Sequence, residues 1–142
     1  MSDNGGNAAA QTWLEEFVRA HGGVAGSVHY RSGENLLLAA AVNIPEPVRN
    51  VTAVVPRGKG MAGLAMERNR PVSVCNIQTD RSGDVRPGAR AVNAQAAAAL
   101  PIHDPAGDVR AVVGIAFMRD EDLPETELQR LTQAASTLPA SS

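Results

Sequence analysis

The segment Val109–Met118, VRAVVGIAFM, constrains the fold of this chain most, because it is apolar on both sides when it is read as a strand. Successive side chains of a strand point to opposite faces of the sheet. Val113, Ile115 and Phe117 therefore share one face. The opposite face carries Val112, Gly114, Ala116 and Met118. A strand of this kind needs cover on both sides, so the segment predicts a central strand with one layer packed against each face of its sheet.

Turn residues between apolar runs predict two hairpins in that sheet. The strands that we expect are residues 27–31, 36–42, 52–55, 72–77, 94–102 and 109–118. Ser32–Asn35 joins the first two strands and His103–Asp108 joins the last two, since both connections are rich in turn-forming residues. Hairpins make the sheet largely antiparallel, which places the chain in the α+β class.

Three helices are expected around the sheet. The first carries Trp13, Leu14, Phe17 and Val18 at helical spacing, with Asn7 as its N-cap and Gly22-Gly23 as its end. A short helix over residues 61–68 ends before Pro71. The last helix has Pro124 in its first turn, and its apolar face is formed by Leu128, Leu131, Ala135 and Leu138. We expect a flexible leader at residues 1–10, one domain at 11–138 and a tail at 139–142.

Gly58-Lys59-Gly60-Met61-Ala62-Gly63 matches the GxGxxG pattern of dinucleotide-binding folds, and Asp80 lies 22 residues after Gly58, near the expected place of a ribose-binding acid. That fold needs repeated βαβ crossovers and a parallel sheet. Only one short helix fits between Gly63 and Pro71, and Pro56-Arg57 separates the preceding strand from the glycines. We therefore interpret the glycines as a tight turn and expect no NAD.

Composition and charge exclude further classes. A chain of 142 residues with 44% hydrophobic residues is long and apolar enough for one globular domain. Its net charge of −2 gives no general attraction to nucleic acid. The N-terminal segment Met1–Asn7 lacks the basic and apolar parts of a secretory signal, and charged, Gly or Pro residues interrupt every long apolar run. We expect a cytoplasmic protein that binds neither nucleic acid nor membrane.

The sequence offers few cysteines and histidines that could bind a metal or cofactor or form a disulfide. Cys75 is the only cysteine, which excludes an intramolecular disulfide and a multi-cysteine zinc site. The three histidines, His21, His29 and His103, are scattered without chelating spacing, so we expect packed or surface side chains rather than metal or haem ligands. Cys75 alternates with Val74 and Ile77 in a strand, which favours an inert buried thiol. No cofactor is expected.

Three motifs in order resemble the GAF domain family. The segment "VPRGKGMAGLAMERNRPVSVCNIQTD" looks like the family's strand, glycine turn, short helix, next strand and start of a pocket lid. The segment "LPIHDPAGDVRAVVGIAF" is similar to its two central strands, and "LPETELQRLTQAA" to its closing helix. The resemblance covers about residues 13–138. It implies a six-stranded antiparallel sheet of the profilin-like kind, with the terminal helices on one face and the short helix plus a lid loop over a ligand pocket on the other.

Known GAF chemistries match this sequence poorly. Cyclic-nucleotide-binding members carry an Asn-Lys-Phe-Asp-Glu signature, and the region 118–127 lacks the Asn-Lys pair. Bilin-binding members attach the chromophore through a Cys near the lid, whereas Cys75 is expected in mid-strand. Free methionine sulfoxide reductases of this family need a nucleophilic and a resolving thiol. This chain has Ala62 where those enzymes have a Cys in the glycine turn, and no second thiol. We therefore expect no catalytic residues.

The remaining candidates form an anion pocket in the family's lid region. The ligand-binding candidates are Lys59, Met61, Arg81, Arg86, Arg90, Ala98 and Ala116. The three arginines belong to the lid, residues 79–93, and would give charge-assisted hydrogen bonds to an anion held above Lys59 and the helix start at Met61. The alternative is three solvated arginines beside Asp80 and Asp84. Residues 96–99, all alanines, line a cavity or allow close helix packing, and both interpretations stay open.

The resemblance thus implies a non-catalytic sensory or regulatory domain. It would hold a small ligand and signal through its terminal helices, either as a homodimer or to a separate output protein. The apolar residues of those helices, Trp13, Leu14, Phe17, Leu131 and Leu138, would supply a dimer surface wherever core packing leaves them free. The rival hypotheses are a ligand-free dimerisation or protein-interaction module and, with less support, a methionine sulfoxide reductase that uses Cys75.

Overall fold

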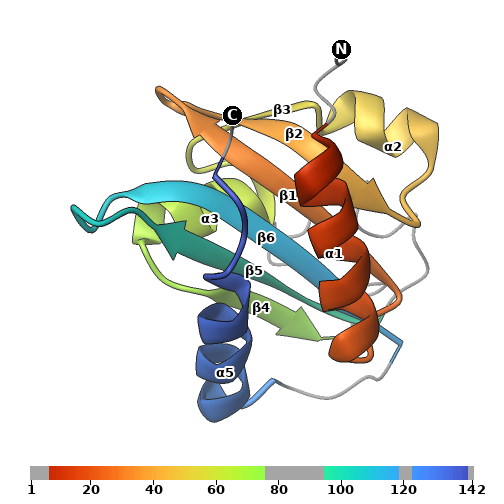
Figure 1. Ribbon diagram of the computed structural model, residues 1–142. Helices are drawn as coiled ribbons and strands as arrows, with labels where there is room; N and C mark the ends of the chain where they lie inside the picture. The colour runs from red at the N-terminus through yellow and green to blue at the C-terminus, as the bar shows by residue number, and fades with distance from the viewer. Residues whose placement is uncertain (1–6, 76–94, 119–122, 141–142) are drawn as a thin grey trace.

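A computed structural model describes residues 7–75, 95–118 and 123–140 of the chain. Its centre is a six-stranded sheet in the order β3-β2-β1-β6-β5-β4, in which every neighbouring pair is antiparallel (Figure 1). The strands are β1 (Ala25–Ser32), β2 (Asn35–Val42), β3 (Val54–Pro56), β4 (Val72–Cys75), β5 (Ala96–His103) and β6 (Val109–Phe117). The predicted α+β class and six-stranded antiparallel sheet are confirmed, although the predicted lid at 79–93 lies outside the described residues.

Strand β6 is central, as its two apolar faces predict. It pairs with β1 on one side and with β5 on the other. Val113, Ile115 and Phe117 belong to one hydrophobic cluster, whereas Val112 belongs to a second on the other face. A shift in register between Ile102 and His103 opposite the start of β6 marks a β-bulge.

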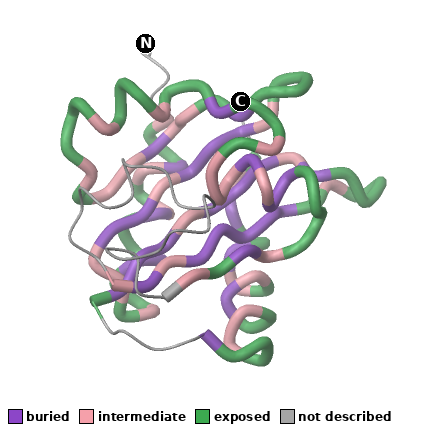
Figure 2. The backbone as a smooth tube through the Cα atoms, turned by 180° about the vertical axis from the view of Figure 1, so that it is seen from behind, coloured by how far each residue is buried: buried purple, intermediate pink, exposed green. Residues whose placement is uncertain are grey.

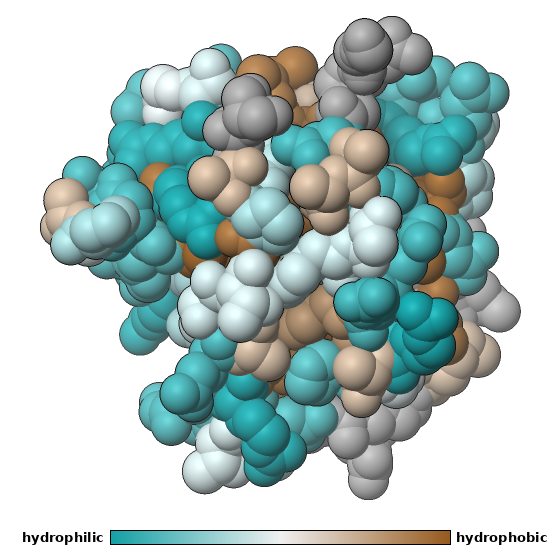
Figure 3. All heavy atoms as spheres, viewed as in Figure 1, coloured by the Kyte–Doolittle hydropathy of each residue, from teal (hydrophilic) through white to brown (hydrophobic). Residues whose placement is uncertain are grey.

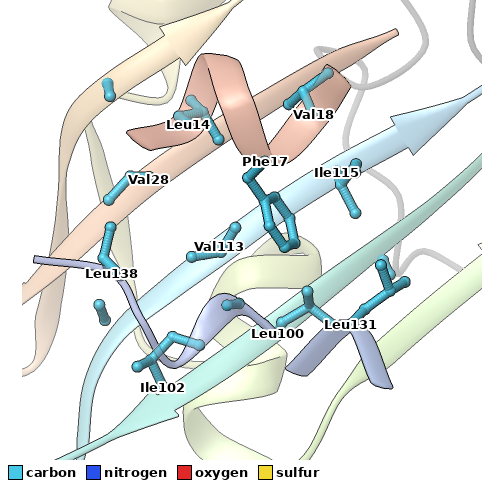
Figure 4. Packing of buried hydrophobic residues seen from close by; sticks show 14 of the residues in the cluster. Leu14, Phe17, Val18, Val28, Leu100, Ile102, Val113, Ile115, Leu131 and Leu138 are labelled. Atoms are coloured by element: carbon cyan, nitrogen blue, oxygen red, sulfur yellow. The ribbon is translucent and has the colours of Figure 1, made fainter. Parts of the chain in front are cut away.

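Helices cover both faces of the sheet. Helices α1 (Ala8–Ala20) and α5 (Glu125–Ala135) lie on one face, and α3 (Gly60–Arg68) lies on the other (Figure 1). Figure 4 shows Phe17 of α1 and Leu131 of α5 pointing toward the strand residues beneath them. On this face, hydrophobic side chains show at several separate places among mostly hydrophilic ones (Figure 3). The two-layered cover inferred from β6 is therefore present.

Helix α2 (Glu46–Val51) is absent from the sequence-based expectation. Pro45 precedes it, with a φ of −59° and extended backbone, and the helix has six residues. None of its residues is buried, so it has no apolar face and therefore no helical periodicity for the sequence to show. The chain then enters β3 at Val54, two residues after the predicted start of that strand.

Helix α1 begins at Ala8, because the Asn7 Oδ1 atom accepts a hydrogen bond from the Ala10 backbone N–H at 3.0 Å. The predicted cap is confirmed. Ala10 is fully buried against the sheet, so residues 8–10 belong to the packed domain rather than to the leader expected at 1–10. The reason is physical: alanine is a strong helix former, and its small side chain lets the first turn of α1 sit close to the strands.

The chain after α5 forms a C-terminal strap, which we define as residues 137–139. The strap is held by three side chains from separate elements: Trp13 Nε1 donates to Thr137 Oγ1 at 2.9 Å, Arg110 Nη2 to the Leu138 carbonyl at 2.9 Å, and Tyr30 OH to the Pro139 carbonyl at 2.6 Å. Leu138 is 3% exposed. It lies beyond the helix rather than on its apolar face as predicted, and residue 139 belongs to this packed strap rather than to a tail.

Candidate functional site

The three glycines of the GxGxxG match have local structural reasons. Gly58 and Gly60 have φ angles of 81° and 62°, which are left-handed conformations that glycine adopts without strain. Gly63 lies inside α3, where an added Cβ would stand 2.4 Å from the Pro56 carbonyl oxygen at the end of β3. The sheet has no parallel pair among the described strands, so the interpretation of the glycines as a tight turn is confirmed.

Helix α3 links the two edges of the sheet. The helix follows β3 at one edge and precedes β4 at the other, and it packs on the face that lies opposite α1 and α5 (Figure 1). Its C-terminal half buries Ala65 and Met66 against the strands. Asn69 ends the helix in the left-handed conformation, with a φ of 57°, just before Pro71.

Beside the start of α3, the same face of the sheet carries a small-residue floor. We use this name for Ala25, Ser27, Ala97, Gly114 and Ala116. Their strand partners place them together: Ala25 pairs with Ala116, and Ser27 with Gly114. An added Cβ at Gly114 would stand 2.8 Å from the Ser27 Oγ atom, which shows that the two residues face each other.

Larger apolar side chains border the floor. Met61 from the first turn of α3, Val24 before β1 and Val74 of β4 pack against Ala25 and Ala116. Figure 2 shows this side of the molecule, on which buried and intermediate residues run along the central strands. The floor itself offers no side chain beyond a hydroxyl, and the Met61 side chain packs beside it.

The predicted site residues separate into three groups. Met61 and Ala116 come together at the floor. Lys59 is the exposed N-cap residue of α3 and makes no side-chain cap hydrogen bond. Ala98 lies on the opposite face, packed 2% exposed in the cluster under α1 and α5, so it cannot share a site with Met61. Arg81, Arg86 and Arg90 lie outside the described residues, and the anion pocket built on them stays a prediction.

The error at Ala98 comes from strand alternation. Residues 96–99 are all alanines, so nothing in their chemistry distinguishes the two faces. The pairing of Ala97 with Ala116 and of Ala98 with Ile115 fixes the register. Ala97 therefore takes the place at the floor that the prediction gave to Ala98.

His29 is a buried polar residue on the face of the floor, and the sequence did not predict it as a candidate site residue. It lies in β1 on the same face as the floor, where it pairs with Val112 and follows Ser27 by two residues. Its side chain is 4% exposed, and its Nε2 atom lies 2.9 Å from the Thr52 carbonyl oxygen. Its Nδ1 atom is buried and has no hydrogen-bond partner among the residues that the structure describes. Burial lowers the pKa of His29 below its ordinary value of 6.5, and the hydrogen bond to Thr52 offsets part of that effect.

A sequence signal for His29 exists in retrospect. Ser27, His29 and Arg31 alternate with Val28 and Tyr30 along β1, so one face of this strand carries polar residues. The prediction of a packed or surface histidine is correct as far as burial goes. Sequence alone could not show that one ring nitrogen keeps its partner and the other lacks one.

Other chemistry finds little support in the part of the chain that the structure describes. No group of three metal-ligating residues gathers there. No helix among the described residues is both long and apolar enough to cross a membrane. Cys75 is the last residue of β4, which is an edge strand of the sheet, so the mid-strand position expected for it stays a prediction, and Ala62 stands in the first turn of α3.

Comparison with known proteins agrees with the fold. The GAF domain family matches residues 7–138, and the resemblance inferred from the three sequence motifs is confirmed. No curated protein is similar enough to this chain to count as a match.

Solved structures similar to this chain are distant in sequence. The GAF domain of a phosphoenolpyruvate-protein phosphotransferase from Coxiella burnetii is 17% identical, with a TM-score of 0.75 over 92% of this chain and 78% of that one. A type II free methionine-R-sulfoxide reductase from Thermoplasma acidophilum is 12% identical, with a TM-score of 0.69 over 92% and 91%. The NreA protein of Staphylococcus aureus, mutated in its nitrate binding site, is 17% identical, with a TM-score of 0.67 over 87% and 98%. At these identities the likeness shows the fold alone, and it includes both enzymes and binding proteins.

Proposed function

Because this chain belongs to the GAF domain family, we propose that it is a non-catalytic sensory or regulatory domain that binds a small ligand over the floor beside α3. The observation that carries the proposal is the separation of the two sheet faces. One face is covered by the terminal helices and the C-terminal strap, whereas the other combines small residues, Met61 and a buried polar side chain.

Strand β1 offers a physical route for the signal. His29 points to the floor side, and the next residue, Tyr30, points to the other side and donates to the Pro139 carbonyl in the strap. Protein interiors are close-packed, so a displacement of the strand at the site is felt by residues packed on its other face. A ligand that moves β1 would therefore change how firmly the strap and the terminal helices are held.

The proposal is tested by looking for a ligand that stays bound during purification and for added compounds that bind. Native mass spectrometry of the purified protein should show a small molecule bound in one copy per chain, or a thermal-shift panel of metabolites should raise the melting temperature for at least one compound. Absence of both effects would favour the alternative, a ligand-free interaction module.

An anionic ligand is one candidate for this site, and it rests on the arginines that the sequence predicts for the lid. Among the described residues the start of α3 supplies Lys59 as a cation, and the three arginines would have to supply the rest. The double variant Arg86→Ala/Arg90→Ala should weaken binding of an anionic ligand most at low salt, because salt screens such contacts. Unchanged affinity at low salt would contradict the anion hypothesis.

The alternative, a ligand-free interaction module, needs exposed apolar side chains that can form a dimer surface. Leu14, Phe17, Leu131 and Leu138 are each at most 5% exposed within one chain, so core packing leaves little of them for a homodimer. Exposed apolar side chains lie elsewhere, among them Leu37 and Val54, which pair across β2 and β3. Light scattering after gel filtration should report whether the proposed homodimer forms, and the Leu37→Ser variant should leave it intact if the terminal helices mediate it.

A reductase is the remaining alternative, since one similar structure is a reductase of free methionine-R-sulfoxide. The single cysteine gives no resolving thiol within the chain. Turnover of free methionine sulfoxide with an added thiol reductant, lost in Cys75→Ser, would support an enzyme; no turnover would leave the binding function. The proposed location is the cytoplasm, and a separate output protein is the proposed receiver of the signal.

A further inference from the structure

The hydrogen bond between His29 and Thr52 fixes the state of the ring. A backbone carbonyl oxygen can only accept, so the Nε2 atom must carry the proton that is donated to Thr52. The burial of His29 favours the neutral ring, because a charged group loses its hydration there. A neutral imidazole protonated at Nε2 keeps a lone pair on Nδ1. Nδ1 of His29 is therefore a hydrogen-bond acceptor, and it is buried with no donor from the described part of the chain.

The surroundings of His29 on this face are apolar. Its cross-strand partners are Val112 on β6 and Leu38 on β2, and the Ser27–Gly114 pair of the floor follows one step along the sheet. Arg31 shares the face, but its guanidinium is engaged by the carbonyls of Gly33 and Val109 and by the Glu34 carboxylate. The described residues thus bring no charge to the Nδ1 atom.

A buried acceptor without a donor is costly, and a group that supplies the donor recovers this cost. We propose that the ligand of this site is a small neutral molecule with a flat apolar body and one O–H or N–H group, which it donates to Nδ1 of His29 while its body lies on the small-residue floor against Met61. The inference rests on the proposed function, which says that a ligand binds over the floor. It adds the class of ligand and the residue that selects it.

The lone pair discriminates between ligand classes. It attracts a hydroxyl or amide N–H, repels the oxygen of an ether of the same shape, and repels an anion. An anion could bind there only if Nδ1 took up a proton at the same time, so its affinity would fall steadily as the pH rises above about 6.5. A neutral donor has no such dependence.

Phenol, anisole and benzoate test these differences with one ring size. Titration calorimetry should show phenol binding about tenfold more tightly than anisole, which has the same ring but no donor. The affinity for phenol should be the same at about pH 7 and pH 8, and benzoate should bind more weakly than phenol at both. In the variant Ala116→Leu, which fills the floor, phenol binding should be lost.

The variant His29→Gln isolates the acceptor. The Gln amide N–H can still donate to Thr52, and the only acceptor left is Oε1 at the end of the side chain instead of a ring nitrogen next to Cγ, so the preference for phenol over anisole should fall. Nitrogen-15 NMR of the unmodified protein gives a second measurement that does not depend on the variant folding. The resonance of an unprotonated Nδ1 should move toward its hydrogen-bonded position with phenol and stay in place with anisole.

The outcomes separate this inference from the proposed function. Equal affinities for phenol and anisole, or an Nδ1 resonance that phenol does not move, would overturn the acceptor role and leave the sensor proposal standing on the metabolite panel. An Nδ1 resonance already at its hydrogen-bonded position without any ligand would show that a buried water satisfies the ring, and would overturn it as well. If phenol does not bind, this class of ligand is excluded. If neither the metabolite panel nor native mass spectrometry finds any ligand, the proposed ligand-binding function is wrong as well.

Discussion

Replacing Gly63 by alanine should destabilise the protein, although helix propensity predicts the opposite. Gly63 lies inside α3, where alanine is favoured over glycine by about 1 kcal/mol. The added Cβ, however, would stand 2.4 Å from the Pro56 carbonyl oxygen and 3.0 Å from the Gly58 backbone nitrogen. Both contacts are backbone atoms, so no side chain can rotate away. The helix and the end of β3 must move apart by at least 0.6 Å to reach 3.0 Å, the shortest distance that real Cβ contacts tolerate.

Overpacking of this kind costs typically about 1–3 kcal/mol and occasionally more, so the net loss after the gain in propensity is up to roughly 2 kcal/mol. Urea unfolding followed by circular dichroism should show a lower midpoint, and the melting temperature should fall by up to about 8 °C. The hydrogen bond from the Gly58 N–H to the Gly63 carbonyl lies in the same contact, so it should weaken too.

Gly33→Ala is the matched control. Gly33 has a φ of 63° in the turn of the first hairpin, and an added Cβ there would meet nothing within 4 Å. Its cost should come from backbone strain alone, about 1 kcal/mol. If Gly63→Ala instead raises the stability by the propensity increment, α3 does not press on the end of β3, and the structural account of the glycine motif is wrong.

The other predictions concern the strap and the two faces of β1. Leu138→Ala should cost about 2–5 kcal/mol in urea unfolding, because the side chain is buried; a loss within error of zero would mean that the strap is not packed. Because burial lowers the pKa of His29, the unfolded chain binds a proton near pH 6.5 that the folded protein binds only at lower pH. Stability should therefore fall as the pH is lowered from about 7, by up to 1.4 kcal/mol per unit, and this slope should be absent in His29→Gln. Burial raises the pKa of Tyr30 despite the opposing Arg110 charge. The contribution of Tyr30 to the free energy of unfolding is therefore complete below about pH 10 and is lost as the pH rises further. The stability of Tyr30→Phe should depend less steeply on pH between about pH 9 and 11, and an identical pH profile would contradict the burial of the hydroxyl.

Local pattern predicted most of the fold. The alternation in β6 required two covering layers, and the structure has them. The turn residues placed both hairpins, and Asn7 marked the start of α1. Each of these signals is local, since it depends on residues within a few positions of one another. Helix α2 was not predicted because none of its residues is buried, and a helix shows a periodic pattern of apolar residues only where one side of it is buried.

The candidate site was harder to predict, because its residues come from separate strands and their register is a tertiary property. The four alanines of residues 96–99 are chemically alike, and only pairing with β6 sends Ala97 to the floor and Ala98 to the opposite core. The surroundings of His29 were set in the same way. Its partner Thr52 lies 23 residues along the chain, and no local rule links the two.

By itself, then, the sequence determined the class of the fold, the antiparallel pairing, the two covered faces and the meaning of the glycine turn, because hydrophobic periodicity and backbone sterics act over short distances. Tertiary structure alone decided which small residues form the floor, which nitrogen of His29 keeps its partner, and how residues 137–139 are held. Those outcomes depend on strand register and on contacts between residues far apart in the chain, where the packing of one side chain is fixed only after all its neighbours are in place.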